Sequence, residues 1–170
     1  MKRVFLTGMS GTGKSAVISE LAARGYKAID TDYGGWSELV DVPPSSGTTG
    51  LGEGKDWLWR EDRIARLLAT EDTDVLFISG GTSNQRKFYT QFDHIVLLTA
   101  PTELMKERLA TRTNNPYGKD PGQLARVLAL KETVEPALRH IAKIEIDTSV
   151  PLAQVVDKIL SVALAAGPRR

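Results

Sequence analysis

Short apolar runs alternate along the chain with stretches whose apolar residues recur every three or four positions. Five of the runs have the length of strands, and glycine or polar residues follow each of them closely. These runs cover residues 4–6, 26–29, 75–78, 95–98 and 144–146. The runs at 75–78 and 95–98 are apolar at every position, which is typical of parallel strands buried on both faces.

The stretches between the runs have helical spacing. Helices are predicted over residues 14–23, from about 57 to 69, and over 101–111, 124–138 and 152–160. The second of them would place Trp57 and Leu58 on the same side as Ile64. Because strands and helices alternate, and crossovers between parallel strands are right-handed, we expect an α/β fold with a parallel sheet covered by helices on both faces.

Two segments are rich in residues that break regular structure. Between Asp41 and Gly54, ten of fourteen residues are Gly, Pro, Ser or Thr, and residues 114–122 contain two prolines and two glycines. Such segments bury little apolar area, so they are predicted to be mobile loops that close over bound substrate. We therefore expect one domain over residues 1–170, with a mobile substrate-binding region at about 33–60 and a lid at about 112–122.

Composition narrows the possible partners. The chain has 170 residues, of which 41% are hydrophobic and 25% charged, with 22 Lys and Arg against 21 Asp and Glu. This balance indicates one globular domain and gives no reason to expect nucleic acid or an anionic membrane as a partner. No apolar run approaches the roughly 18 residues of a membrane span. The absence of cysteine excludes disulfides and thiolate metal sites and fits a cytoplasmic location.

The segment from Gly8 to Ser15 carries the most specific motif. It reads Gly-Met-Ser-Gly-Thr-Gly-Lys-Ser and matches the phosphate-loop pattern G-x-x-x-x-G-K-[ST] between the first strand and the first helix. Backbone N–H groups of such a loop bind phosphates, Lys14 contacts the β and γ phosphates, and the Ser15 hydroxyl ligates Mg²⁺. An ordinary glycine-rich turn is the alternative, but chance would produce the match in about one per cent of chains this long. The residues expected to bind ATP are Gly8, Ser10, Gly11, Thr12, Gly13, Lys14 and Ser15.

Two carboxylates follow the second strand, in the sequence Asp30-Thr31-Asp32. Carboxyl ends of parallel strands share one edge of the sheet, so both carboxylates should lie beside the phosphate loop. Asp32 could accept a proton from an attacking hydroxyl, and Asp30 could hold a Mg²⁺-bound water. Alternatively, one of them caps a helix that begins near Tyr33.

Together these motifs resemble the small P-loop kinases, which include shikimate kinase, gluconate kinase and the adenylate-kinase-like nucleoside and nucleotide kinases. The resemblance adds a Gly-Gly pair after the third strand and an Arg-rich segment after the fourth. It implies the P-loop NTPase fold with a five-stranded sheet of order 2-3-1-4-5. It also implies an enzyme, monomeric or homodimeric, that uses ATP and Mg²⁺ to phosphorylate a small-molecule acceptor.

The resemblance also implies roles for single residues. It places Asp30 near Mg²⁺ and Asp32 on the acceptor hydroxyl, and Arg60 resembles the arginine that grips a substrate carboxylate. Gly80 and Gly81 resemble glycines that let the substrate approach the sheet. The chain departs from shikimate kinases where Asn115 precedes a lid proline and where no arginine precedes Pro136. The acceptor is therefore left open among nucleosides, nucleotides and hydroxylated metabolites.

Arg108 and Arg112 lie four residues apart, so on a helix they would reach the same phosphates. The resemblance implies that an arginine here covers the adenine or clamps the transferred phosphoryl group, which adds Arg112 to Lys14 and Asp32 as a catalytic candidate. A solvated basic face paired with Glu103 and Glu107 is the alternative. Thr148 follows the last strand in a segment that resembles the adenine-framing loop, and a plain strand-to-helix cap would explain it as well.

A second class of function is a nucleotide-dependent switch that hydrolyses its nucleotide slowly. The sequence lacks the Asn-Lys-x-Asp guanine signature, and the kinase-sized core with its two loops uses the whole chain, which favours the kinase. Further candidates for the acceptor pocket are Trp36, Trp57 and Trp59, which flank the first loop, and the polar residues 84–87. Core packing and a polar helix start are the competing explanations for them.

Overall fold

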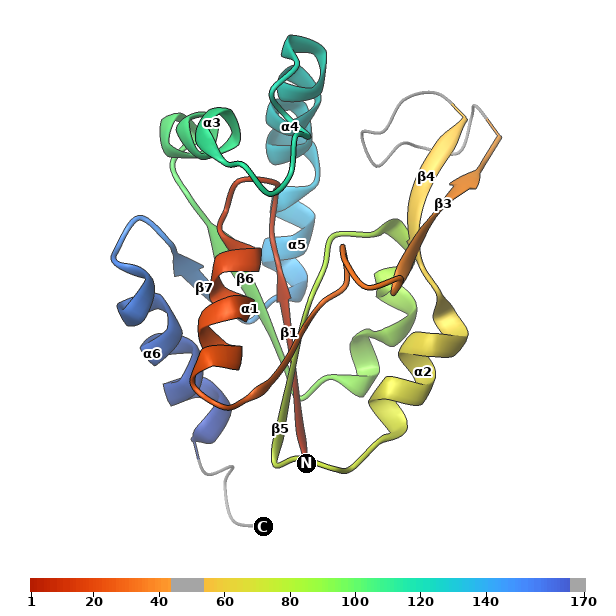
Figure 1. Ribbon diagram of the computed structural model, residues 1–170, viewed down its shortest axis with the longest axis vertical. Coiled ribbons are helices and arrows are strands. Elements are labelled where there is room, and N and C mark those ends of the chain that lie inside the picture. Colours follow the sequence, from red (N-terminus) through yellow and green to blue (C-terminus); the bar gives the residue numbers. More distant parts are fainter. Residues whose placement is uncertain (44–53, 166–170) are drawn as a thin grey trace.

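Five parallel strands form the centre of the computed structural model, which describes residues 1–43 and 54–165 (Figure 1). The strands are β1 (Lys2–Thr7), β2 (Lys27–Asp30), β5 (Val75–Ser79), β6 (His94–Thr99) and β7 (Ile144–Asp147). They lie in the order β2-β5-β1-β6-β7, which is the predicted order 2-3-1-4-5 of the five parallel strands. The predicted α/β fold is therefore confirmed.

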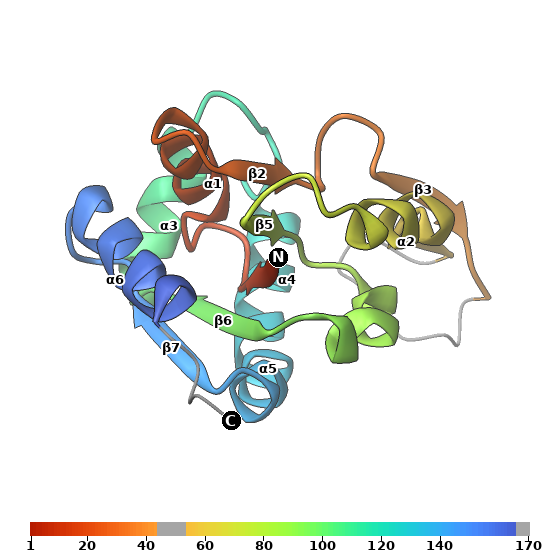
Figure 2. The same ribbon diagram turned by 90° about the horizontal axis from the view of Figure 1, so that it is seen from below.

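Helices cover both faces of the sheet (Figure 2). The helices are α1 (Lys14–Ala23), α2 (Glu61–Ala69), α3 (Thr102–Thr111), α4 (Pro121–Thr133), α5 (Glu135–Ile141) and α6 (Leu152–Leu164), together with a 3₁₀ helix, η1 (Ser83–Gln91). The core clusters place α1 and α6 on one face of the sheet and α2 with η1 on the other. A third cluster packs α3, α4 and α5 against β6.

Strand β1 shows how the sequence produces these layers. Val4 and Leu6 pack among the residues of α1 and α6, whereas Phe5 between them packs against α2 and η1. All three side chains are fully buried, and burial of each contributes about 1.5–3 kcal/mol. A strand that is apolar at consecutive positions therefore requires helices on both faces, because neighbouring side chains point in opposite directions.

A β-hairpin replaces the start of one predicted helix. Strands β3 (Ser37–Asp41) and β4 (Lys55–Trp59) pair antiparallel in a separate two-stranded sheet. The prediction that Trp57 and Leu58 lie on a helix was wrong, because both belong to β4 and the helix begins only at Glu61. The predicted mobile loop lies largely at residues 44–53, outside the described residues, and its flanks Asp41 and Lys55 are paired to each other.

The helix predicted over residues 124–138 is two helices. Helix α4 ends at Thr133, Val134 joins it to α5, and Pro136 lies in the first turn of α5. Proline has no N–H to continue the hydrogen-bond ladder of α4, whereas it fits the first turn of a new helix. No helix within residues 1–43 and 54–165 has the length and apolarity to cross a membrane.

Candidate active site

The phosphate loop connects β1 to α1, as the sequence predicts. Gly13 precedes the helix with φ 93°, a left-handed conformation that glycine adopts without strain. A Cβ atom on Gly8 would lie 2.4 Å from the carbonyl oxygen of Leu98. The loop therefore needs glycine at Gly13 for its conformation and at Gly8 for its close approach to β6.

Helix α1 and Lys14 present positive charge inside this loop. The helix begins without a side-chain cap and without an acidic residue in its first turn, so no side chain competes with an anion for its N-terminal N–H groups. Lys14 Nζ donates hydrogen bonds to the carbonyl oxygens of Gly8 at 2.6 Å and Met9 at 3.1 Å. Burial lowers the pKa of Lys14, and the carboxylates of Asp32 and Asp30 oppose this shift. A phosphate group fits such a loop.

Ser15 and Asp30 lie together at the carboxyl end of β2. Ser15 Oγ donates a hydrogen bond to Asp30 Oδ2 at 2.5 Å, and Asp30 Oδ1 accepts one from the Asp32 backbone at 3.1 Å. A hydroxyl and a carboxylate in contact are the oxygen donors that Mg²⁺ prefers. Residues 31–36 form turns and bends, so the alternative in which an aspartate caps a helix near Tyr33 is wrong.

Asp32 is held at the edge of the site by an indole. Trp57 Nε1 on β4 donates a hydrogen bond to Asp32 Oδ1 at 3.3 Å. Burial is the main reason that the pKa of Asp32 is raised, and the nearby Asp30 adds to it, while Lys14, Trp57 and Arg112 act in the opposite direction. A carboxylate with a raised pKa is better suited to accept a proton than an ordinary surface aspartate.

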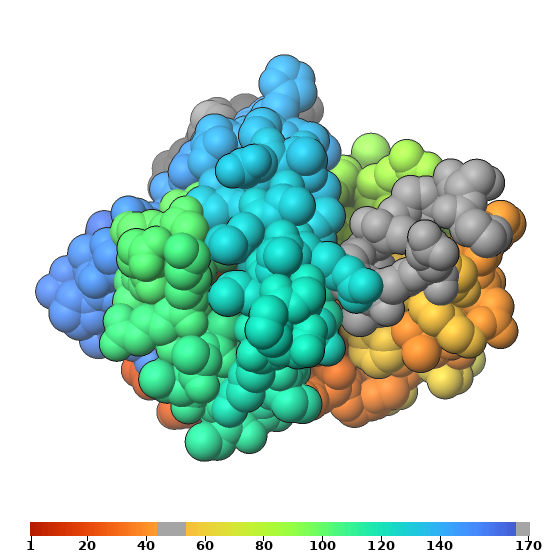
Figure 3. Space-filling view, turned by 90° about the horizontal axis from the view of Figure 1, so that it is seen from above, coloured from red at the N-terminus to blue at the C-terminus, as the bar shows by residue number. Residues whose placement is uncertain are grey.

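Two cavities meet at these residues. The larger cavity, of about 440 Å³, extends from the phosphate loop toward β4, η1 and α4, and the smaller cavity, of about 370 Å³, extends toward α3 and the start of α6. Four residues line both cavities: Ser10, Lys14, Asp32 and Asn115. In the view from above, α3 (green) lies on the left, α4 (teal to cyan) in the centre and the β3–β4 hairpin (orange and yellow) on the right (Figure 3). Lys14 and Asp32 therefore stand at the junction of two spaces.

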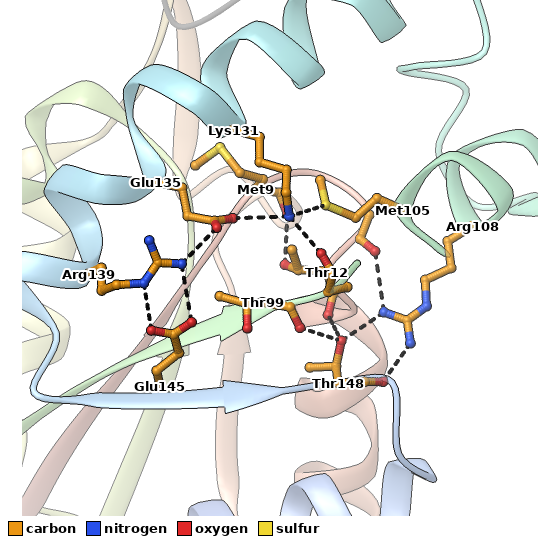
Figure 4. A network of polar contacts seen from close by, with 12 residues as sticks. Met9, Thr12, Thr99, Met105, Arg108, Lys131, Glu135, Arg139, Glu145 and Thr148 are labelled. Carbon is orange, nitrogen blue, oxygen red and sulfur yellow. Dashed lines mark hydrogen bonds and ion pairs between the residues drawn. The ribbon is translucent and has the colours of Figure 1, made fainter. Parts of the chain in front are cut away.

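Arg108 and Thr148 fix one wall of the smaller cavity (Figure 4). Arg108 donates hydrogen bonds to Thr148 Oγ1 at 2.8 Å and to the Thr148 carbonyl oxygen at 2.7 Å. Thr148 Oγ1 in turn donates to the carbonyl oxygen of Thr12 at 2.7 Å, so Thr148 links Arg108 to the phosphate loop. Of the two acids in the alternative, Glu103 forms its ion pair with Lys106, whereas the charge of Glu107 acts on Arg108 and raises its pKa against the effect of burial.

Arg112 lines the same cavity just beyond the end of α3. Its Nη2 donates a hydrogen bond to the carbonyl oxygen of Tyr117 in the segment between α3 and α4. Its Nε is buried and has no hydrogen-bond partner within the described part of the chain. Arg108 and Arg112 thus lie on one cavity wall, as their spacing predicts.

The predicted acceptor-binding residues divide into two groups. Gly81 lines the larger cavity, whereas a Cβ atom on Gly80 would meet Thr31 and Trp59 in the core. Arg60 lines neither cavity, and its half-exposed side chain pairs with Glu38 at 3.2 Å. The structure therefore does not bring Arg60 to the cavity that Asp32 borders.

Comparison with known proteins assigns the family. The model of the AAA domain family matches residues 4–129, which is most of the chain. The chain belongs to the AAA domain family. Two solved structures share the fold of this AAA-domain protein. One is a shikimate kinase from Acinetobacter baumannii in complex with shikimate, which is 20% identical, with 99% of this chain and 96% of that chain covered and a TM-score of 0.64. The other is a gluconokinase from Sinorhizobium meliloti 1021, which is 22% identical, with 96% of this chain and 91% of that chain covered and a TM-score of 0.59.

Two curated relatives are similar in sequence to this AAA-domain protein. A shikimate kinase of Halorhodospira halophila is 28% identical, with 98% of this chain and 95% of that protein aligned. A nucleotide-binding protein of Thermosipho africanus is 27% identical over 86% of this chain, and the aligned part covers 48% of that protein's length. The resemblance to small P-loop kinases of the shikimate and gluconate kinase group is thus confirmed.

Sequence reasoning missed much of the larger cavity of this AAA-domain protein. One wall comes from α4, α5 and the residue between them, through Val127, Leu130, Val134 and Leu138. Apolar residues at helical spacing normally face a core, so their pattern gave no signal of a cavity. Of the polar candidates 84–87, Gln85 lines the cavity. Asn84 instead holds β4, because its side chain exchanges two hydrogen bonds of 2.9 Å with the backbone of Trp59.

Proposed function

We propose that this AAA-domain protein is an ATP-dependent kinase that transfers the γ-phosphoryl group of ATP to a hydroxyl of a small molecule. One observation carries the proposal: two separate cavities meet at Lys14 and Asp32. The smaller cavity has the basic side chains that a triphosphate needs, and the larger has room for a second substrate. A kinase must bring two substrates together at one phosphorus atom, and two joined cavities provide for that.

The residues of the smaller cavity account for nucleotide binding. Lys14, Arg108 and Arg112 line it, and together they would balance the negative charge of a triphosphate. Ser15 and Asp30 would hold Mg²⁺ directly or through water, and the bound ion would neutralise charge on the phosphate oxygens. The segment that follows Thr148 also lines this cavity, which supports a place for the adenine there.

Asp32 is the residue that would act on the acceptor. Its raised pKa favours acceptance of a proton, and we assign it the proton of the acceptor hydroxyl at the moment of attack. The Trp57 indole N–H keeps one carboxylate oxygen in place, so the other oxygen is left to face the acceptor. Lys14 stabilises the negative charge that spreads over the transferred group.

Acceptor-dependent formation of ADP tests the proposal. Purified protein with ATP and Mg²⁺ is assayed with and without nucleosides, nucleotides, gluconate, shikimate and other hydroxylated compounds. We expect ADP formation to rise at least tenfold with one class of acceptor, and Lys14→Ala to abolish the increase. A rate of hydrolysis that no acceptor changes would favour a nucleotide-dependent switch instead.

A further inference from the structure

The larger cavity has very little charge. Within residues 1–43 and 54–165, its lining contains one positive side chain, Lys14, and one negative side chain, Asp32. The segment 44–53 contributes no Lys or Arg to the sequence. Once Lys14 contacts the phosphates of a bound nucleotide, Asp32 is the remaining charge on the described lining, and Arg112, whose charge acts on Asp32, lines the smaller cavity with its nucleotide. The cavity is then neutral to negative.

Basic residues close to the larger cavity are held elsewhere. Lys131 on α4 donates a hydrogen bond to the carbonyl oxygen of Ala100 at 2.6 Å and lies 3.7 Å from the buried Glu135. Arg139 on α5 pairs with Glu135 at 3.0 Å and with Glu145 at 2.7 Å (Figure 4). These ion pairs hold both cations in the network around Glu135, and neither side chain lines the cavity.

Two other arginines also lie outside the larger cavity. Arg60 pairs with Glu38 on β3, and Arg126 is exposed on α4, from where its charge acts on Tyr117 of the lining. Neither belongs to the lining of either cavity. On the β4 side, the buried Asp56 accepts a hydrogen bond of 2.7 Å from Ser83, which does line the cavity. The carboxylate of Asp56 therefore lies directly behind the part of the cavity wall that Ser83 forms.

The remaining surface of the cavity is apolar or neutral. Val127, Leu130, Val134 and Leu138 form the wall on the α4–α5 side, and Trp57 contributes an indole from β4. Ser83 and Gln85 are neutral polar side chains of the lining, and both are hydrogen-bonded within the protein, Ser83 to Asp56 and Gln85 to Tyr89 and the backbone N–H of Thr82. Such a wall gains affinity by burying apolar or aromatic surface, whereas a buried anion without a cation is strongly disfavoured.

We infer that the phosphoryl acceptor is an uncharged compound that presents a hydroxyl group to Asp32 and an apolar or aromatic body to the α4–α5 wall. This inference rests on the proposed kinase function and specifies its substrate class. The inference distinguishes this protein from kinases whose acceptor carries a carboxylate or a phosphate group, because the described lining supplies no arginine to bind such an anionic group.

Matched pairs of compounds test the inference by binding. The pairs are uridine with uridine 5′-monophosphate, thymidine with thymidine 5′-monophosphate, and shikimate methyl ester with shikimate, so the members of each pair differ by one anionic group. Calorimetry is performed on the full chain saturated with Mg²⁺ and a non-hydrolysable ATP analogue. We expect at least one neutral member to bind, and each neutral member that binds to do so at least tenfold more tightly than its anionic partner. Equal or tighter binding of the anionic partner, or no binding of any neutral member, would overturn the inference.

A charge placed in the cavity wall provides the second test. Val134, which precedes α5, and Ile141, the last residue of α5, are both 38% exposed, but only Val134 lines the cavity. Val134→Arg should shift the binding preference toward the anionic members at least tenfold, and Ile141→Arg should leave it unchanged. If Val134→Arg does not fold, Leu130→Arg places the charge in the same wall. An unchanged preference in a folded wall variant would contradict the inference.

Phosphoryl transfer from ATP, measured separately on the same pairs, distinguishes the two proposals. Transfer to an anionic member alone would leave the kinase function standing and overturn the substrate class. Preferential binding of the neutral members without transfer to any compound would overturn the kinase function and leave standing the inference that the cavity takes neutral ligands.

Discussion

The two adjacent glycines after β5 should respond in opposite ways to the same substitution. A Cβ atom on Gly80 would lie 2.5 Å from Thr31 Oγ1 and 3.0 Å from Trp59 Nε1. A Cβ atom on Gly81 would meet its nearest neighbour, the Gly8 carbonyl oxygen, at an ordinary 3.8 Å. Gly80→Ala should therefore disturb the core, whereas Gly81→Ala should place a methyl group at the edge of the larger cavity.

The magnitude for Gly80→Ala follows from what Thr31 holds. Thr31 Oγ1 donates to the Ser79 carbonyl oxygen at 2.6 Å and accepts from Trp59 Nε1 at 2.8 Å, and both Thr31 and Trp59 are buried. Moving Thr31 aside leaves a buried donor unpaired, which costs about 1–3 kcal/mol, and crowding adds about 1–3 kcal/mol. The lower entropy of the unfolded alanine chain offsets about 0.4–1 kcal/mol. With mid-range values of the three terms, the free energy of unfolding should fall by about 3 kcal/mol, or about 6–12 °C in Tm.

Thermal melts of the two variants and of the natural chain, together with acceptor kinetics, measure both effects. Gly81→Ala should melt within about 3 °C of the natural chain and raise the acceptor KM several-fold, with the KM for ATP unchanged. A Gly80→Ala protein that melts with the natural chain would refute the reasoning. So would a loss of stability confined to Gly81→Ala.

Three further substitutions test the site. Asp32→Asn should lower kcat roughly 10²-fold. In the natural protein, the acid limb of the kcat/KM profile should lie above the ordinary aspartate pKa of 3.8, because burial raises the pKa of Asp32. The Asp32→Asn variant should lack this limb. The same variant should raise Tm at neutral pH, since a carboxyl whose pKa is raised on folding destabilises the fold once it is ionised. Trp57→Phe removes a hydrogen bond to the ionised Asp32, so the acid limb should move to higher pH, as a pH–rate profile will show. Thr148→Val breaks the link between Arg108 and Thr12, and should cost about 1–3 kcal/mol of stability in denaturant titration and raise the KM for ATP.

The sheet and the phosphate loop could be predicted because their signals are local. Apolar runs at 75–78 and 95–98 mark strands buried on both faces, and the residues from Gly8 to Ser15 match a motif whose spacing the loop conformation requires. The position of Asp32 followed from the same logic, since parallel strands end at one edge of the sheet. These predictions needed no knowledge of how distant segments pack.

The acceptor side could not be predicted in the same way. The hairpin depends on pairing between Ser37–Asp41 and Lys55–Trp59, two segments that the sequence separates by a glycine- and proline-rich stretch. Once Trp57 and Leu58 belong to a strand, Arg60 precedes a helix at the surface, where it meets Glu38. Whether an apolar helix face borders a core or a cavity is likewise decided by tertiary packing.

Detection of the phosphorylated product tests most directly whether Lys14 and Asp32 mark a site of phosphoryl transfer. After incubation of the protein with ATP, Mg²⁺ and a panel of neutral and anionic hydroxyl compounds, mass spectrometry determines which acceptors have gained a phosphoryl group. We expect one phosphorylated acceptor for each ADP formed, greatly reduced product with Asp32→Asn, and none with Lys14→Ala. ADP formation without any phosphorylated acceptor, or undiminished product from the Asp32→Asn protein, would contradict this assignment.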